Sequence, residues 1–123
     1  MKKYDLQKRL ISFSVSIIQL TEKLPRNYVG IHLGKQMTRS GTAPVLNYGE
    51  AQAAESRADF IHKMKVCLKE LRETQVNLLI INKLNYVPQG KMDICSKECA
   101  ELVAIFTSSI STAKENRLLN RKM

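Results

Sequence analysis

Tryptophan is absent from this 123-residue sequence, and aromatic residues make up only 6% of it. No apolar run reaches the roughly 18–20 residues that a membrane-spanning helix requires. The first residues include two lysines, but no uninterrupted apolar block follows them, which argues against a secretory signal. We therefore expect a cytoplasmic protein that has no membrane partner.

Cysteine and histidine are too scattered to indicate a metal site. The three cysteines cannot all pair with one another, and each lies among apolar residues, so we expect them to be reduced and buried. Cys95 and Cys99 are four residues apart, but no second Cys or His pair stands at a ligand-like spacing. His32 and His62 are isolated. The sequence therefore predicts no metal and no cofactor.

Groups that carry catalysis are also scarce. Neither histidine has an acid or a nucleophile at a fixed offset, so few partners exist for acid–base work. The stretch 30–34 contains two glycines but lacks the Gly-Lys-Ser/Thr ending and the preceding strand of a phosphate-binding loop. We expect no enzymatic activity, no catalytic residues and no small-molecule substrate.

Helical periodicity is the main feature that the sequence does have. Apolar positions alternate at spacings of 4 and 3, which averages 3.5 residues per turn, and no segment alternates with period two. Short loops between long helices make neighbouring helices antiparallel. The pattern predicts one all-α domain over residues 1–123, an up-down antiparallel four-helix bundle with helices at about 5–24, 27–54, 57–84 and 92–118. The repeating positions are Leu6, Leu10, Phe13, Ile17, Leu20 and Leu24; Phe60, Met64, Cys67, Leu71, Thr74, Leu78 and Ile81; and Cys95, Cys99, Leu102, Phe106, Ser109 and Ala113.

The expected helix ends follow from local signals. Pro25 should end the first helix, because a residue before proline is disfavoured in the α region. Ser56 stands three residues before Asp59, which is close to a capping box, and Asp93 could cap the last helix. The tail after Lys114 is polar and basic, so we expect it to fray.

The second helix is the least regular. Four of the five glycines fall in this segment, and glycine inside a helix costs about 1 kcal/mol relative to alanine. Close approach of a neighbouring backbone is one way to offset that cost. Pro44 lacks the N–H for a helical hydrogen bond, so we expect a kink, or two short helices, near Gly41–Pro44.

The net charge of +9 is the unusual feature of the composition. A basic surface attracts nucleic acid, acidic partners or anionic membranes. The excess is spread along the chain without a block of like charges, so a solubilising surface is the alternative. With few aromatics, binding would be to phosphate and would depend steeply on salt. The candidate nucleic-acid contacts are Lys63, Lys65, Lys69 and Arg72 on the third helix, and Lys8 and Arg9 on the first.

A possible polar network lies in the second helix, where Arg39, Asn47 and Glu50 stand among small residues. Asn47 and Glu50 share a helix face, and Glu50 could meet Arg39 or Lys69. The sequence leaves two interpretations of these residues open. They form either a solvated polar side of the helix or a partly buried network that fixes the register between helices.

The middle third of the chain contains a series of motifs: Arg39-Ser40-Gly41-Thr42, Asn47-Tyr48, Glu50-Ala51, residues 56–65, Leu68-Lys69-Glu70 and Arg72-Glu73-Thr74. Together they resemble a known family, small four-helix-bundle proteins first noticed as reading frames inside intervening sequences of bacterial large-subunit ribosomal RNA genes. The resemblance implies a closed four-helix bundle and a ring-forming homo-oligomer, typically a pentamer. A similar fold occurs in the accessory protein of diversity-generating retroelements, which is basic and works with a reverse transcriptase and nucleic acid. The family offers no accepted catalytic residues.

The sequence is compatible with two functions. One is a homo-oligomeric binding module whose basic surface contacts RNA or a nucleic-acid enzyme. The other is a protein-interaction scaffold, suggested by a second apolar line beside the first seam. That second line consists of Ile11, Val15 and Ile18.

Overall fold

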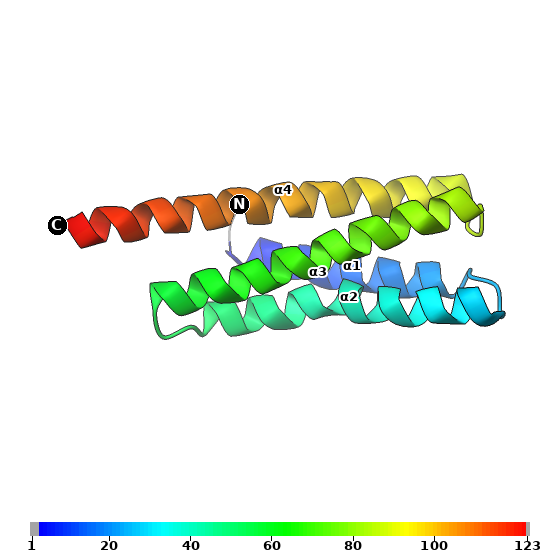
Figure 1. Cartoon of the computed structure of the whole chain (residues 1–123), viewed down its shortest axis with the longest axis horizontal. Coiled ribbons are helices and arrows are strands. Elements are labelled where there is room, and N and C mark those ends of the chain that lie inside the picture. Colours follow the sequence, from blue (N-terminus) through cyan, green and yellow to red (C-terminus); the bar gives the residue numbers. More distant parts are fainter. Residues whose placement is uncertain (1–2, 123) are drawn as a thin grey trace.

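A computed structural model describes residues 3–122, together with the side chains of residues 5–116 and 118. It contains four helices, α1 (Lys3–Thr21), α2 (Tyr28–Gln52), α3 (Arg57–Leu84) and α4 (Gln89–Lys122), and no strand among the described residues. α1 packs on α2, α2 on α3, α3 on α4, and α4 on α1. Consecutive helices run in opposite directions (Figure 1). The predicted all-α up-down four-helix bundle is confirmed.

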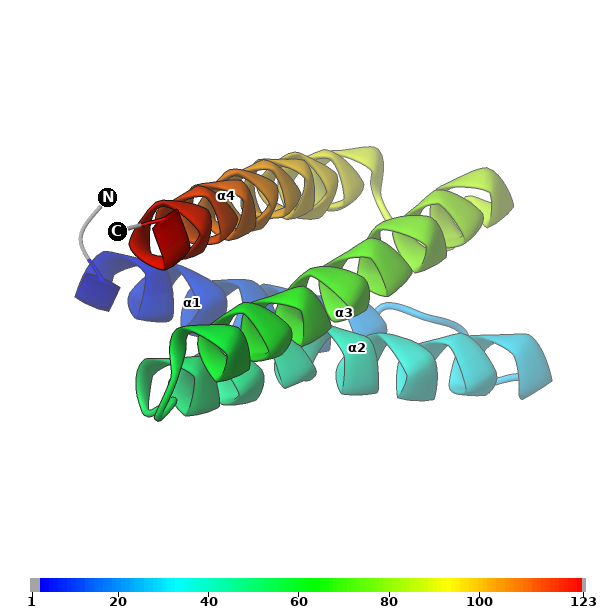
Figure 2. The same ribbon diagram turned by 60° about the vertical axis from the view of Figure 1, so that its left-hand side comes forward.

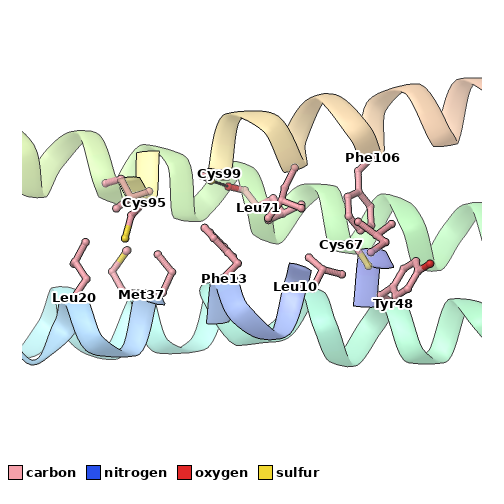
Figure 3. Packing of buried hydrophobic residues seen from close by; sticks show 14 of the residues in the cluster. Leu10, Phe13, Leu20, Met37, Tyr48, Cys67, Leu71, Cys95, Cys99 and Phe106 are labelled. Carbon is pink, nitrogen blue, oxygen red and sulfur yellow. Dashed lines mark hydrogen bonds between the residues drawn. The ribbon is translucent and has the colours of Figure 1, made fainter. Parts of the chain in front are cut away.

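The core consists largely of the predicted seam positions. Nearly all of them are buried, whereas Phe60 and Ser109 are only partly covered. Figure 3 shows side chains from all four helices pointing into one interior. Tyr48 of α2 and Phe106 of α4 meet there edge to face, with ring centroids 6.0 Å apart. The 3.5-residue spacing therefore identified the buried face of three helices.

Two side-chain caps fix the starts of α2 and α3. The Asn27 side-chain oxygen accepts a hydrogen bond from the Gly30 N–H at 2.8 Å, and the Ser56 hydroxyl oxygen accepts one from the Asp59 N–H at 3.0 Å. The predicted cap at Ser56 is confirmed. α3 ends at Asn85, whose φ of 57° is left-handed, a conformation that asparagine adopts more readily than most residues.

α2 is one helix that continues through Pro44, so the expected division into two short helices is wrong. Neighbouring helices hold it on both sides of the proline. The Ser14 hydroxyl of α1 donates to the carbonyl oxygen of Gly41 at 3.0 Å, and the Cys67 thiol of α3 donates to that of Pro44 at 3.5 Å. These contacts attach α2 to its neighbours around Pro44, so packing opposes the break that proline favours. A kink at this point stays a prediction.

The predicted ends of α1 and α4 need correction. α1 stops at Thr21 rather than at residue 24, because the Lys23 and Leu24 N–H groups donate to carbonyls three residues back, at 3.0 and 3.1 Å. α4 begins at Gln89 instead of residue 92, and the Met92 N–H donates to the Pro88 carbonyl at 3.1 Å. Proline suits such a helix start, since its missing N–H is not needed there.

Asp93 therefore lies inside α4, just past its first turn, and is not its cap; its carboxylate accepts from the Gln89 side-chain amide at 2.8 Å. The helix also continues to Lys122, past the expected end at residue 118, whereas fraying after Lys114 stays a prediction. Ala113 is buried and anchors this part, and Lys114, Glu115 and Leu118 all favour helix. α4 projects past the other helices at its C-terminal end (Figure 1).

No described helix is both long enough and apolar enough to cross a membrane.

Candidate nucleic-acid interface

A basic groove of about 780 Å³ lies between α2 and α3. The two helices lie side by side, with α3 tilted across α2 (Figure 2). Lys65, Lys69, Arg72 and Val76 follow one another at spacings of 4, 3 and 4, which places them on one face of α3. Arg39 of α2 adds a fourth cation. The residues that line the groove are Gln36, Arg39, Lys65, Leu68, Lys69, Arg72, Glu73, Val76 and Asn77.

Arg39 is held by two carboxylates from α3. Its Nη1 lies 3.2 Å from an oxygen of Glu70, and its Nη2 lies 3.1 Å from an oxygen of Glu73. The side chain of Arg39 is 62% exposed, whereas that of Glu70 is only 12% exposed. Burial raises the pKa of Glu70, the nearby Glu73 carboxylate raises it further, and Arg39 opposes both effects. The guanidinium is thus at the groove surface while one of its partners is nearly enclosed.

A buried hydroxyl pair also connects α2 to α3, formed by the residues that follow Arg39 and Glu73 in the sequence. The Thr74 hydroxyl lies 2.8 Å from the Ser40 hydroxyl oxygen and 2.9 Å from the Glu70 carbonyl oxygen. Both side chains are fully buried. Because a buried hydroxyl needs a hydrogen-bonding partner, this contact favours one register between the two helices. It therefore helps to position Arg39 opposite the two acids.

The groove brings together three of the six predicted nucleic-acid contacts, Lys65, Lys69 and Arg72. Lys65 also lies near Lys114 of α4, whose ammonium lowers the pKa of Lys65. Positive charge therefore continues from the groove towards α4.

The other three predicted contacts lie elsewhere. Lys63 is half-buried, and its ammonium lies 3.6 Å from a carboxylate oxygen of Glu50. Lys8 and Arg9 are on α1, and neither of them lines the α2–α3 groove. The Arg9 guanidinium binds both carboxylate oxygens of Glu98 on α4, so it joins helices within the bundle.

The structure does not gather Arg39, Asn47 and Glu50 into one network. Arg39 pairs with α3 as described, and the Asn47 side-chain amide donates to the Ala43 carbonyl one turn back at 3.0 Å. Glu50 pairs with Lys63, not with Arg39 or Lys69. The register-setting polar contact is instead the Ser40–Thr74 pair. Its only signal in the sequence is Thr74, the one polar residue in the α3 seam.

An exposed apolar stripe runs along α1. Ile11, Val15 and Ile18 are 48%, 47% and 39% exposed, although they lie beside the buried seam of the same helix. The spacing of 4 and 3 residues keeps them on one face. One chain alone does not bury this second apolar line.

The histidines and cysteines are widely separated. His32 is exposed on α2 and stacks on Tyr28, with ring centroids 6.4 Å apart, and His62 is exposed on α3. Cys67, Cys95 and Cys99 are free and buried. Within the part of the chain that the structure describes, no group of three or more His, Cys, Asp or Glu residues could hold a metal ion.

Comparison with known protein families identifies the family of this chain. The sequence profile described as 23S rRNA-intervening sequence protein matches residues 2–108, which is most of the chain. The chain belongs to this family. The resemblance inferred from the sequence motifs is thereby confirmed.

A solved structure supports the same assignment. The chain is similar to a protein of unknown function from the S23 ribosomal protein family of Bacteroides thetaiotaomicron. The two share 31% sequence identity with a TM-score of 0.82, and the match covers 90% of this chain and 99% of the other. No curated protein matches the sequence.

Proposed function

We propose that this intervening-sequence protein is a non-enzymatic, homo-oligomeric binding module that contacts RNA, or a nucleic-acid enzyme, through its basic surface. The observation that carries the proposal is the α2–α3 groove, where Arg39, Lys65, Lys69 and Arg72 face a single lining acid, Glu73. Cations on two helices in one groove match a chain of phosphates better than isolated surface charges do. We place the protein in the cytoplasm, where its three free thiols would stay reduced.

The groove favours recognition of the phosphate backbone over recognition of bases. Its lining residues include no aromatic side chain on which a base could stack. Contacts between Lys or Arg and phosphate position a nucleic acid but do not read its sequence. We therefore expect binding that tolerates many sequences and weakens steeply with salt, with a Kd of about 10⁻⁶–10⁻⁴ M near physiological salt.

Titration of a fluorescently labelled single-stranded RNA, at several salt concentrations, tests this proposal. The Lys69→Gln/Arg72→Gln double variant removes two groove cations, so its salt slope should be shallower than that of the wild type by about 1.4. At low salt it should bind about tenfold more weakly, since each phosphate contact contributes to a salt-dependent affinity.

The matched control is Lys23→Gln/Lys97→Gln, which removes the same charge from exposed positions outside the groove. Equal losses in the two double variants would show that net charge alone drives binding. Absence of salt-sensitive RNA binding by the wild type at low salt, with protein up to about 100 μM, would contradict the proposal.

Assembly into a ring, with a pentamer favoured, is part of the same proposal. The exposed α1 stripe of Ile11, Val15 and Ile18 supplies apolar surface that a second copy could cover. Repetition of a +9 subunit around a ring would concentrate positive charge that one copy spreads thinly.

The same stripe favours a second candidate function, a protein-interaction scaffold in which the charge only keeps the protein soluble. The two functions make opposite predictions for the Lys69→Gln/Arg72→Gln double variant. A scaffold would retain its protein partner after Lys69 and Arg72 are neutralised, and it would show no salt-sensitive RNA binding.

A further inference from the structure

Arg39 differs from the other cations of the groove in what it contacts. Both ends of its guanidinium are engaged, one by Glu70 at 3.2 Å and the other by Glu73 at 3.1 Å. Among the described residues, none of Lys65, Lys69 and Arg72 takes part in an ion pair within 4.0 Å. Three groove cations therefore face outwards, while the fourth is occupied by the protein itself.

The two carboxylates occupy the position that a phosphate would need. The planar guanidinium fork recognises carboxylates and phosphates through the same paired N–H donors. Glu73 lines the groove, and its side chain is 36% exposed, so an incoming phosphate and the Glu73 carboxylate would compete for one end of Arg39.

We propose that Glu70 and Glu73 act as internal competitors that hold Arg39 and thereby limit the affinity of the α2–α3 groove for a phosphate backbone. This inference rests on the proposed nucleic-acid function and adds its regulation. The groove of the wild type then has three working phosphate contacts, Lys65, Lys69 and Arg72, and a fourth that is held in reserve.

The spacing of Lys65, Lys69 and Arg72 along α3 is compatible with three phosphate contacts. Lys65 and Arg72 are seven residues apart, which corresponds to about 10 Å along a helix. Over that length the three cations lie on one face of α3, so they can contact neighbouring phosphates of a single strand. Three contacts with single-stranded RNA give a salt slope of about −2.1, and a released Arg39 would change it to about −2.8.

The Glu73→Gln variant tests the inference, because it frees one end of Arg39 while preserving the shape of the side chain. We expect labelled single-stranded RNA to bind this variant about fivefold more tightly at low salt, with a salt slope steeper by about 0.7. The control is Glu55→Gln, which removes one negative charge at an exposed residue in the α2–α3 connection. Its affinity should change less than about twofold, since it only alters net charge.

The Arg39→Gln substitution provides a second readout. In the wild type, loss of Arg39 should weaken binding less than loss of Lys69, since Arg39 is already occupied. In the Glu73→Gln background the same loss should remove the fivefold gain. This non-additivity is the signature of competition for one side chain. Thermal unfolding followed by circular dichroism would show that both variants retain the helical fold.

The outcomes separate the inference from the function on which it rests. If wild-type binding depends on Lys69 and Arg72 but Glu73→Gln binds no more tightly than Glu55→Gln, the competition is disproved and the function stands. The competition is equally disproved if Arg39→Gln and Lys69→Gln weaken the wild type to the same degree. If the wild type shows no salt-sensitive binding, the proposed function fails first, and the inference fails with it.

Discussion

At the scale of single residues, burial in the core changes the chemistry of the cysteines. The Cys67 thiol donates to the Pro44 carbonyl at 3.5 Å, and the Cys99 thiol donates to the Leu71 carbonyl at 3.4 Å. Burial raises the pKa of each thiol to about 12, because a thiolate would lose its hydration there. These cysteines therefore behave as small apolar residues that connect neighbouring helices, as the sequence suggested.

Raised thiol pKa values make the stability of the fold sensitive to alkaline pH. In the unfolded chain the thiols lose their protons near pH 9, whereas in the folded protein they keep them until about pH 12. The free energy of unfolding is therefore unaffected by these thiols below pH 9 and falls as the pH rises from 9 towards 12. Urea unfolding at pH 8, 9.5 and 10.5 should show this fall.

The Cys67→Ala variant isolates the contribution of one thiol. It will be less stable than the wild type at pH 8, because it leaves a small cavity, but its stability should decline less steeply with pH. One such thiol accounts for up to about 1.4 kcal/mol per pH unit of that decline. Parallel pH profiles for the two proteins would contradict the raised pKa.

At the scale of helices, close packing against α1 and against the α1–α2 connection accounts for two of the glycines in α2. A Cβ atom on Gly41 would lie 2.7 Å from Ile17 Cγ2 of α1, and one on Gly30 would lie 1.9 Å from the backbone oxygen of Pro25. The expected close approach of a neighbouring backbone is therefore present at Gly30, whereas at Gly41 the neighbour is a side chain. Gly49, in contrast, has nothing within 4 Å of the added atom.

These contacts predict opposite effects for two identical substitutions in one helix. Gly41→Ala should lower the free energy of unfolding by about 1–3 kcal/mol, because Ile17 and the helix must shift. Gly49→Ala should raise it by about 0.5–1 kcal/mol, since alanine favours helix and the site is open. Urea unfolding measures both, and stabilisation by Gly41→Ala would show that α1 and α2 are packed less closely.

The sequence predicted the bundle because spacing along a helix determines its buried face without any knowledge of partners. The same reasoning places Lys65, Lys69 and Arg72 on one face of α3. Contacts between helices depend on register, so the pairing of Arg39 with residues more than thirty positions away could not be predicted. The predicted division of α2 at Pro44 was wrong for a related reason, because contacts from α1 and α3 oppose the local effect of the proline.

At the scale of the whole molecule, the distribution of apolar surface bears on assembly. The bundle buries its 3.5-residue seams but leaves Ile11, Val15 and Ile18 exposed along α1. The α2–α3 groove lies on a different pair of helices, and none of the residues that line it belongs to α1. Copies joined through the α1 stripe could therefore leave the basic groove open to a ligand.

Light scattering tests this arrangement. A pentamer of the 14.0-kDa chain would have a mass of about 70 kDa. Val15→Lys places a charge in the centre of the stripe, and lysine favours the helical conformation, so α1 should remain a helix. The substitution should shift the measured mass to that of one chain. The control Leu46→Lys changes a residue of α2 that is 69% exposed, and it should leave the mass unchanged.

The stripe itself spans only two helical turns, whereas a stable interface covers about 800 Å² on each partner. Neighbouring polar residues of α1 must therefore share the contact, and one lysine is enough to disrupt it because its charge would be buried without a partner. A wild-type mass of 14.0 kDa would refute assembly altogether. An oligomer that survives Val15→Lys but dissociates with Leu46→Lys would place the interface on α2, beside the groove, where copies and nucleic acid would compete for the same helix.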